Sequence, residues 1–201
     1  MSRFPFVVVV LAVAVLLAGC SKEDTSAGCD VDVASAQLRQ QAHAAGLPGC
    51  ATVEGGDTDL PDVSLPCLGS DGAATLAGVK GPAIVNFWSS SCGPCVKEMP
   101  ALAAFDKEYG DQVAVLGVDF LDTYPGAAID LAGHSKVRYP SLADACGALQ
   151  DTDLVIQGLP QFVFVKADGA VEQAAGGVDS VDALVGLVEK NLGITLERSG
   201  S

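Results

Sequence analysis

From residue 60 onward the chain alternates between short apolar runs and stretches whose apolar positions recur at helical spacing. The apolar runs are rich in β-branched and aromatic residues, which favours strands. Turn signals at 70–72 and 167–169 separate two pairs of runs and predict two hairpins. The expected strands are 63–68, 73–76, 83–88, 113–119, 139–142, 161–166 and 170–174, and the expected helices are 35–45, 94–109, 125–136 and 181–192. This alternation predicts a layered α/β domain, whose sheet should be mixed because the second hairpin adds antiparallel strands.

Composition narrows the class of protein. Of the 201 residues, 49% are hydrophobic and 18% are charged, which excludes a wholly disordered chain. The net charge is −14, from 25 acidic and 11 basic side chains. A nucleic-acid partner requires a basic surface, and the sequence has no basic stripe, so we expect no such partner.

The first twenty residues have the pattern of an export signal. Arg3 precedes an apolar run, 6–18, that is shorter than the ~20 residues of a membrane-spanning helix. The run ends in Leu17-Ala18-Gly19-Cys20, which resembles the bacterial lipobox. We therefore expect residues 1–19 to be a lipoprotein signal peptide and Cys20 to be lipidated, which would anchor the protein to the outer side of the bacterial cell membrane. The alternative is an ordinary signal peptide with a chance Cys nearby.

The remaining chain divides into three parts. Residues 20–59 contain small polar stretches around one short helix, and we expect a tether whose helix is closed by a disulfide. Residues 60–195 hold the alternating pattern and form the folded domain. Residues 196–201 form a short C-terminal tail.

The chain has seven cysteines, and an odd number in an exported protein needs an explanation. Lipidation of Cys20 leaves six, and an extracytoplasmic location permits disulfides. Cys92 and Cys95 are expected to pair with each other. The other four allow three connectivities, of which we favour Cys29–Cys50 and Cys67–Cys146. The alternative is that Cys67 and Cys146 are buried free thiols.

Cys92-Gly93-Pro94-Cys95 follows a buried strand and begins a helix. Backbone N–H groups at a helix N-terminus stabilise an anion, so the pKa of the Cys92 thiol should lie below the ordinary ~8.5. A thiolate at Cys92 could attack a disulfide, and Cys95, about one turn further along, could displace the captured sulfur. Pro94 lacks an N–H, which costs nothing in the first turn.

Two other interpretations of this motif are weaker. A zinc site would need two further ligands, but there is no second C-x-x-C, and His43 and His134 stand alone. A purely structural disulfide would not need the strand before the motif and the helix after it.

The segment 86–100, NFWSSSCGPCVKEMP, resembles the active-site segment of the thioredoxin superfamily, and more narrowly that of the TlpA/ResA-like membrane-anchored thiol–disulfide oxidoreductases. The resemblance extends over residues 61–192. It implies a thioredoxin-like three-layer α/β/α fold with a mixed central sheet, an N-terminal β-hairpin, and an extra strand and helix inserted between Cys92 and Pro160.

The resemblance also implies roles for residues around the cysteines. Pro160 would be a cis-proline beside the catalytic pair, with Leu159 presenting its backbone to a bound peptide. The alternative is a trans proline in a plain loop before a strand. Glu98 would handle the proton of Cys95, although it could be an ordinary solvated helix residue. Trp88 would pack beside the catalytic turn, although an ordinary core aromatic fits it equally well. Gly93 with Pro94 forms a dipeptide like that of reducing thioredoxins.

Three departures from the superfamily leave substrate choice and redox potential open. Ser91 stands where Trp is common before the first cysteine, so the surface there should be more open. Asn86 stands where cytosolic thioredoxins carry Asp, and Leu159 replaces a common Thr.

The resulting hypothesis is an extracytoplasmic enzyme that reduces disulfides in exported proteins, with cytochrome c maturation as one task that the resemblance implies. A membrane electron donor would restore the dithiol, and neither an organic cofactor nor a metal is needed. The alternatives are a disulfide-forming oxidant and a non-catalytic lipoprotein on the same fold.

Overall fold

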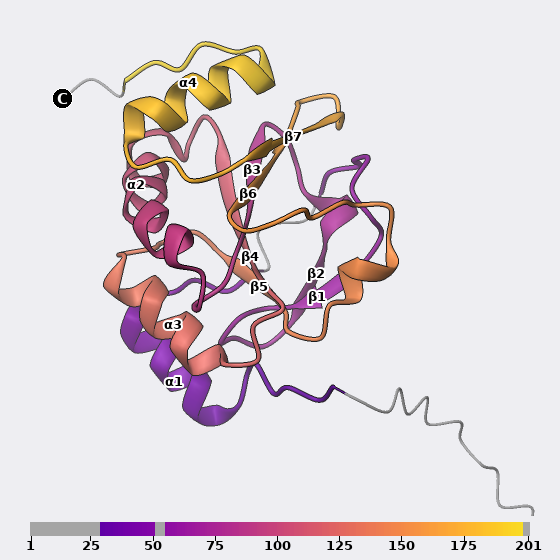
Figure 1. The fold of residues 1–201 in the computed structure, drawn as a ribbon, viewed down its shortest axis with the longest axis vertical. Coiled ribbons are helices and arrows are strands. Elements are labelled where there is room, and N and C mark those ends of the chain that lie inside the picture. Colours follow the sequence, from indigo (N-terminus) through magenta and orange to yellow (C-terminus); the bar gives the residue numbers. More distant parts are fainter. Residues whose placement is uncertain (1–28, 51–54, 199–201) are drawn as a thin grey trace, which may run out of the picture.

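The computed structural model describes residues 29–50 and 55–198, and the expected signal peptide and Cys20 lie outside these ranges. Its main sheet has the strand order β5-β4-β3-β6-β7 (Figure 1). β3 (Ala83–Trp88) is parallel to β4 (Ala114–Phe120), which is parallel to β5 (Ser141–Asp144). β3 is antiparallel to β6 (Gln161–Val165), which pairs antiparallel with β7 (Val171–Ala175). The expected mixed sheet is therefore confirmed.

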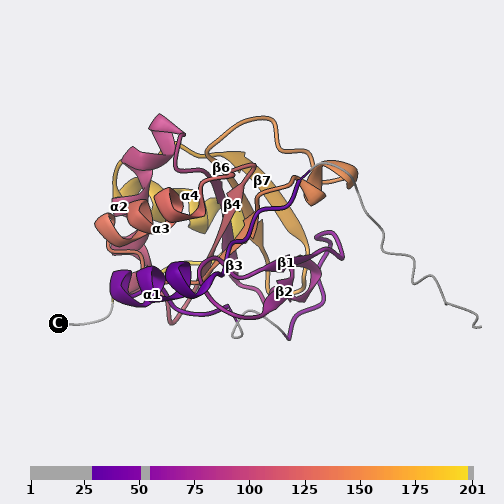
Figure 2. The same ribbon diagram turned by 90° about the horizontal axis from the view of Figure 1, so that it is seen from below.

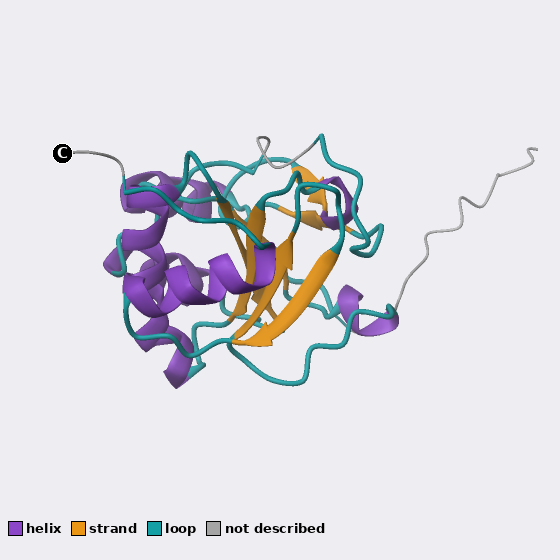
Figure 3. Cartoon of the chain, turned by 90° about the horizontal axis from the view of Figure 1, so that it is seen from above, coloured by secondary structure: helices purple, strands orange, loops and turns teal. Residues whose placement is uncertain are grey.

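The α-helices of the described chain lie together on one face of this sheet, as Figures 2 and 3 show. They are α1 (Ala36–Ala45), α2 (Gly93–Tyr109), α3 (Pro125–His134) and α4 (Val181–Leu192). The crossovers β3–α2–β4 and β4–α3–β5 advance across the sheet in the same direction, and right-handed connections then place α2 and α3 on the same face. α1 packs on α3, and α4 packs on α2.

The opposite face is covered without long helices. A hairpin of β1 (Ser64–Pro66) and β2 (Ala73–Thr75), together with the 3₁₀ turns η1 (Leu76–Gly78) and η2 (Ala148–Asp151), packs against it. The N-terminal hairpin is as expected, and so are the extra helix and strand, α3 and β5. In a three-layer α/β/α arrangement, helices cover this face as well. Here the hairpin and the short 3₁₀ turns form that layer.

Local sequence explains most element boundaries. All six residues of β3 are buried, in keeping with its nearly continuous apolar run. The Ser35 hydroxyl accepts the Leu38 N–H at the start of α1, and the Ser180 hydroxyl accepts the Ala183 N–H at the start of α4. Both helices end at a glycine in the left-handed region, as the stop signals predicted. β5 begins two residues later than expected.

The favoured pairing of the four outer cysteines is wrong. The structure joins Cys29 to Cys146 and Cys50 to Cys67, so neither predicted bridge forms and neither Cys67 nor Cys146 is a free thiol. The physical reason is that α1 does not lie in a self-closed loop. It docks on α3, and its two ends reach different partners.

The segment before the domain is therefore fastened to it. Val33, Ala42 and Leu47 are buried in the core on the helical face. Residues 29–50, which we expected within the tether, form part of the folded body. Among the described residues, no helix is long and apolar enough to cross a membrane.

Candidate active site

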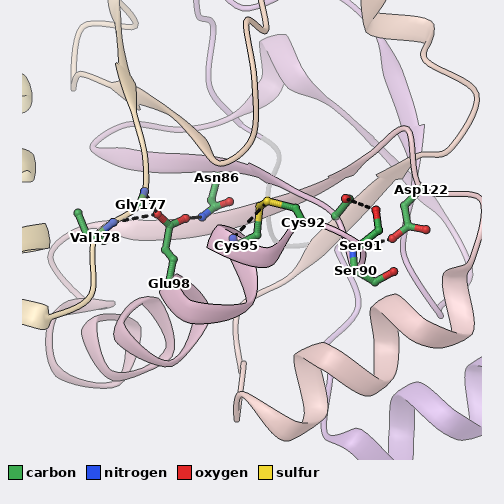
Figure 4. The surroundings of a disulfide bond; sticks show 10 residues. Asn86, Ser90, Ser91, Cys92, Cys95, Glu98, Asp122, Gly177 and Val178 are labelled. Atoms are coloured by element: carbon green, nitrogen blue, oxygen red, sulfur yellow. Dashed lines mark hydrogen bonds between the residues drawn. A yellow bond between two sulfur atoms is a disulfide. The ribbon is translucent and has the colours of Figure 1, made fainter.

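The site lies at the carboxyl end of β3. The loop 89–91 connects β3 to α2, and Cys92 is the N-cap of that helix. Cys92 and Cys95 form a disulfide, as expected (Figure 4). Cys92 is half-buried and Cys95 is fully buried, so an incoming sulfur can reach only the first of the pair. The Cys92 Sγ accepts the Cys95 N–H at 3.2 Å, which directs a helix N–H at this sulfur.

Glu98 lies one turn after Cys95 and is fully buried, so it is not a solvated helix residue. Its Oε1 accepts the Asn86 side-chain N–H at 2.7 Å, and its Oε2 accepts the backbone N–H groups of Gly177 and, at 3.2 Å, Val178. Burial raises the pKa of Glu98 from 4.5 to about 7, although these hydrogen bonds to the carboxylate oppose the increase. Glu98 can therefore hold or release a proton near neutral pH.

Two acids on the other side of the disulfide were missed by the sequence analysis. Asp122 accepts the Ser90 N–H at 2.7 Å and the Tyr124 N–H at 2.9 Å, so it ties the loop before Cys92 to the loop after β4. Asp119 is buried beside it, and burial followed by the Asp122 charge raises the pKa of Asp119 well above its usual range. Figure 4 shows Asp122 and Glu98 on opposite sides of the disulfide. The sequence signal that could have identified them is their position: Asp119 is next to the last residue of the buried strand β4, and Asp122 follows that strand by two residues.

The Leu159–Pro160 peptide bond is cis, as the resemblance implied. β6 begins at the next residue, Gln161, which pairs with Phe87 of β3, so Pro160 lies near the end of β3 that carries the cysteines. The Pro160 carbonyl accepts the Gly176 N–H at 2.9 Å. A second cis bond, Gly81–Pro82, lies at the opposite end of β3 and was not predicted.

The remaining candidates lie close to this arrangement. Trp88 is fully buried in the core beneath the helices, directly before the loop that leads to Cys92. Gly93 is exposed at the helix start, and an added Cβ there would meet no atom within 4 Å. Pro94 is exposed in the first turn of α2. Within the described ranges, no three His, Cys, Asp or Glu side chains are grouped to hold a metal ion.

The mixed sheet and the cysteine pair at the start of α2 define a thioredoxin-like protein of the thiol–disulfide oxidoreductase class. More narrowly, the chain belongs to the AhpC/TSA family, which matches residues 57–174.

Individual relatives agree with this assignment. The chain is 43% identical over 61 residues to the thioredoxin-like protein YneN of Bacillus subtilis, a match that covers 30% of this chain and 35% of YneN. It is 27% identical over 141 residues to the thiol:disulfide interchange protein HelX of Rhodobacter capsulatus, covering 69% of this chain and 78% of HelX. A secreted Mycobacterium tuberculosis disulfide oxidoreductase has the same fold, with a TM-score of 0.56 and 24% identity over 64% of this chain and 96% of its own.

Proposed function

We propose that this protein is a lipid-anchored enzyme outside the cytoplasmic membrane that reduces disulfides in exported proteins. The observation that carries the proposal is the asymmetry of the cysteine pair. Cys92 is accessible at a helix N-cap, whereas Cys95 is buried one turn before an acid whose pKa is about 7.

The reaction follows from this asymmetry. In the reduced enzyme the Cys92 thiolate attacks one sulfur of a substrate disulfide, and the other substrate sulfur leaves as a thiolate. Cys95 then loses its proton to Glu98 and attacks Cys92, which releases the second substrate thiolate. The substrate gains two electrons, and its two thiolates take up protons from solvent or from Glu98. The enzyme is left with the Cys92–Cys95 disulfide.

Substrate binding would use the cis-proline loop. The backbone of Leu159, directly before Pro160, would pair with an extended peptide next to the reacting sulfur. Ser91 leaves the space before Cys92 open, since it is an exposed small residue. Protein segments with a disulfide in an extended region therefore fit this site, and the disulfide of an oxidised apocytochrome c, which must be opened before haem attachment, would be one such substrate.

A membrane-bound dithiol donor would return the enzyme to its reduced state. The relative HelX is a thiol:disulfide interchange protein, which supports exchange with protein thiols on both sides of the cycle. The anchor is proposed from the lipobox-like sequence ending in Cys20. Labelling with radioactive palmitate should be lost in a Cys20→Ala variant if Cys20 carries the lipid.

Mixed-disulfide trapping tests the reaction. A Cys95→Ser variant should retain exported proteins covalently on Cys92, and a Cys92→Ser/Cys95→Ser variant should retain none. The wild-type protein should accelerate insulin reduction by dithiothreitol, and Cys92→Ser should leave only the slow rate of dithiothreitol alone. Failure to trap any partner together with no insulin reduction would contradict exchange chemistry.

Equilibration with glutathione tests the direction of electron flow. A Cys92–Cys95 potential near −270 mV is expected for a reductant, as for thioredoxin. A potential near −120 mV would instead mark a disulfide-forming oxidant.

A further inference from the structure

The two remaining disulfides differ sharply in exposure. Cys50 and Cys67 are 1% and 2% exposed, so their sulfurs are sealed in the core beneath the hairpin. Cys29 and Cys146 are both exposed, although their bridge joins residues 117 apart in sequence. A thiolate must approach a disulfide sulfur directly, so only the second of these bridges is open to attack in the folded protein.

The exposed bridge lies along the same edge of the sheet as the reacting pair. Asp144 at the end of β5 is level with Phe120 of β4, and Trp88 of β3 is level with Asp119. Cys146 follows the end of β5 by two residues, and Cys92 follows the end of β3 by four. With β5 and β3 two strand spacings apart, roughly 10 Å separates their ends along the edge. Both bridges therefore lie beyond the carboxyl ends of parallel strands of the same sheet.

This bridge is also the main attachment of the first described residues. Asp30 and Asp32 are exposed, and Val31 is only partly buried. Among the described residues, the first backbone hydrogen bond that joins this arm to the domain is from the Gly69 N–H to the Val33 carbonyl. Without the disulfide, residues 29–32 would be held by little more than the Val31 side chain.

We propose that Cys29–Cys146 is a second site of thiol–disulfide exchange, reduced by protein dithiols of the class that reduces Cys92–Cys95. The intact bridge attaches the N-terminal arm, residues 29–32, to the sheet edge formed by the carboxyl ends of β3, β4 and β5. A dithiol thiolate attacks one sulfur of the bridge, and the other cysteine leaves as a thiolate that takes up a proton. The second thiol of the dithiol then displaces the first cysteine. Two electrons pass to Cys29 and Cys146, and the dithiol becomes a disulfide.

Opening the bridge changes how the domain is attached to a membrane, a consequence that rests on the proposed lipid anchor at Cys20. With the bridge closed, the chain from residue 20 to residue 29 spans at most about 30 Å. With the bridge open, the fixed point moves to Val33, and the span increases to at most about 45 Å. The closed bridge keeps the active-site edge near the membrane, whereas the open bridge lets the domain reach further.

Stepwise reduction of the full chain tests the proposal. The oxidised protein is incubated without denaturant in increasing dithiothreitol, alkylated with N-ethylmaleimide, and mapped by mass spectrometry. Cys29 and Cys146 should be labelled roughly 100-fold faster than Cys50 and Cys67, because the buried pair reacts only through unfolding. Labelling of all four at one common rate, or only after denaturant is added, would overturn the proposal.

A paired variant separates this claim from the proposed enzyme activity. Cys29→Ser/Cys146→Ser should reduce insulin at the wild-type rate, while the amides of residues 29–32 exchange with solvent faster than in the oxidised wild type. Unchanged amide exchange would show that the bridge does not hold the arm and would overturn the proposal. If the wild-type protein does not reduce insulin, the proposed enzyme activity is wrong. The earlier labelling of Cys29 and Cys146 than of Cys50 and Cys67 would still support the second exchange site.

Discussion

Glu98 is buried, so its ionised form is less stable in the folded protein than in water. Its pKa of about 7 lies above the unfolded value of 4.5, so the folded protein binds the proton more tightly than the unfolded chain. The stability from this group is fully present below about pH 4.5 and is lost as the pH rises through about 7. The expected loss is on the order of 3 kcal/mol.

Replacing Glu98 with Gln should remove this pH dependence. Gln keeps the size of the side chain, and its oxygen can still accept the Gly177 and Val178 N–H groups. Urea unfolding of the oxidised protein at pH 5 to 8 should show wild-type stability falling by about 3 kcal/mol more than that of Glu98→Gln. Parallel curves for the two proteins would show that Glu98 does not titrate in this range.

Single residues differ in how far the sequence can predict them. Cys92, Cys95 and the cis bond before Pro160 could be identified because each belongs to a local motif. The hydrogen-bond partners of Glu98 could not be predicted, because Gly177 and Val178 lie 79 and 80 residues away in sequence. No spacing rule links them to α2. Asp119 was missed because an aspartate after an apolar run usually marks the point where a strand ends and an exposed loop begins. Here it lies within β4 and is buried.

At the scale of elements, the site depends on close contact between the cis-proline loop and α2. Gly176 lies between them, since a Cβ added there would be 2.8 Å from Glu98 Oε2 and 2.9 Å from Pro160 Cβ. Gly176→Ala should displace both groups and lower kcat/KM for insulin reduction about 10-fold.

The matched control is Gly186→Ala in α4. A Cβ at Gly186 meets no atom within 4 Å, and alanine favours a helix, so activity should be unchanged and stability should rise by about 0.5–1 kcal/mol. Equal activity in the two variants would contradict the close packing assigned to Gly176.

The loops after β3 and β4 are joined through Asp122. Asp122→Ala leaves the Ser90 and Tyr124 N–H groups without this acceptor and should cost about 1–3 kcal/mol in urea unfolding. Asp119→Asn should cost nothing and should stabilise the protein as the pH rises, because it removes a buried group whose ionised form is unfavourable. Equal losses from both substitutions would show that the two acids do not have different roles.

Most elements could be predicted from the sequence because their signals are local. β3 was correct from its apolar run, and α1 and α4 were correct from their serine caps and terminal glycines. The pairing of the outer cysteines was wrong because it depends on where α1 docks. That docking is a contact with α3, about 90 residues later in the chain, as the bond from Gln41 to Asp130 illustrates.

At the scale of the whole molecule, the net charge of −14 is poorly compensated. The ion pairs of the described chain lie at its surface, as in Arg39–Asp71 with side chains 42% and 85% exposed, and such pairs contribute little. Stability should therefore increase when the ionic strength rises from about 0.01 M to about 0.5 M, because screening reduces the repulsion between acids. Urea unfolding at both salt concentrations checks this, and a decrease would mean that the surface ion pairs outweigh the repulsion.

Exchange at this site requires the fold to hold Cys92 as a reactive thiolate. The pH dependence of alkylation of reduced Cys92 with iodoacetamide, in the Cys95→Ser variant, measures this property. We expect a titration midpoint clearly below the ~8.5 of an ordinary thiol and fast reaction at pH 6. A midpoint at or above that value, with Cys92 no faster than a cysteine in a short peptide, would contradict it.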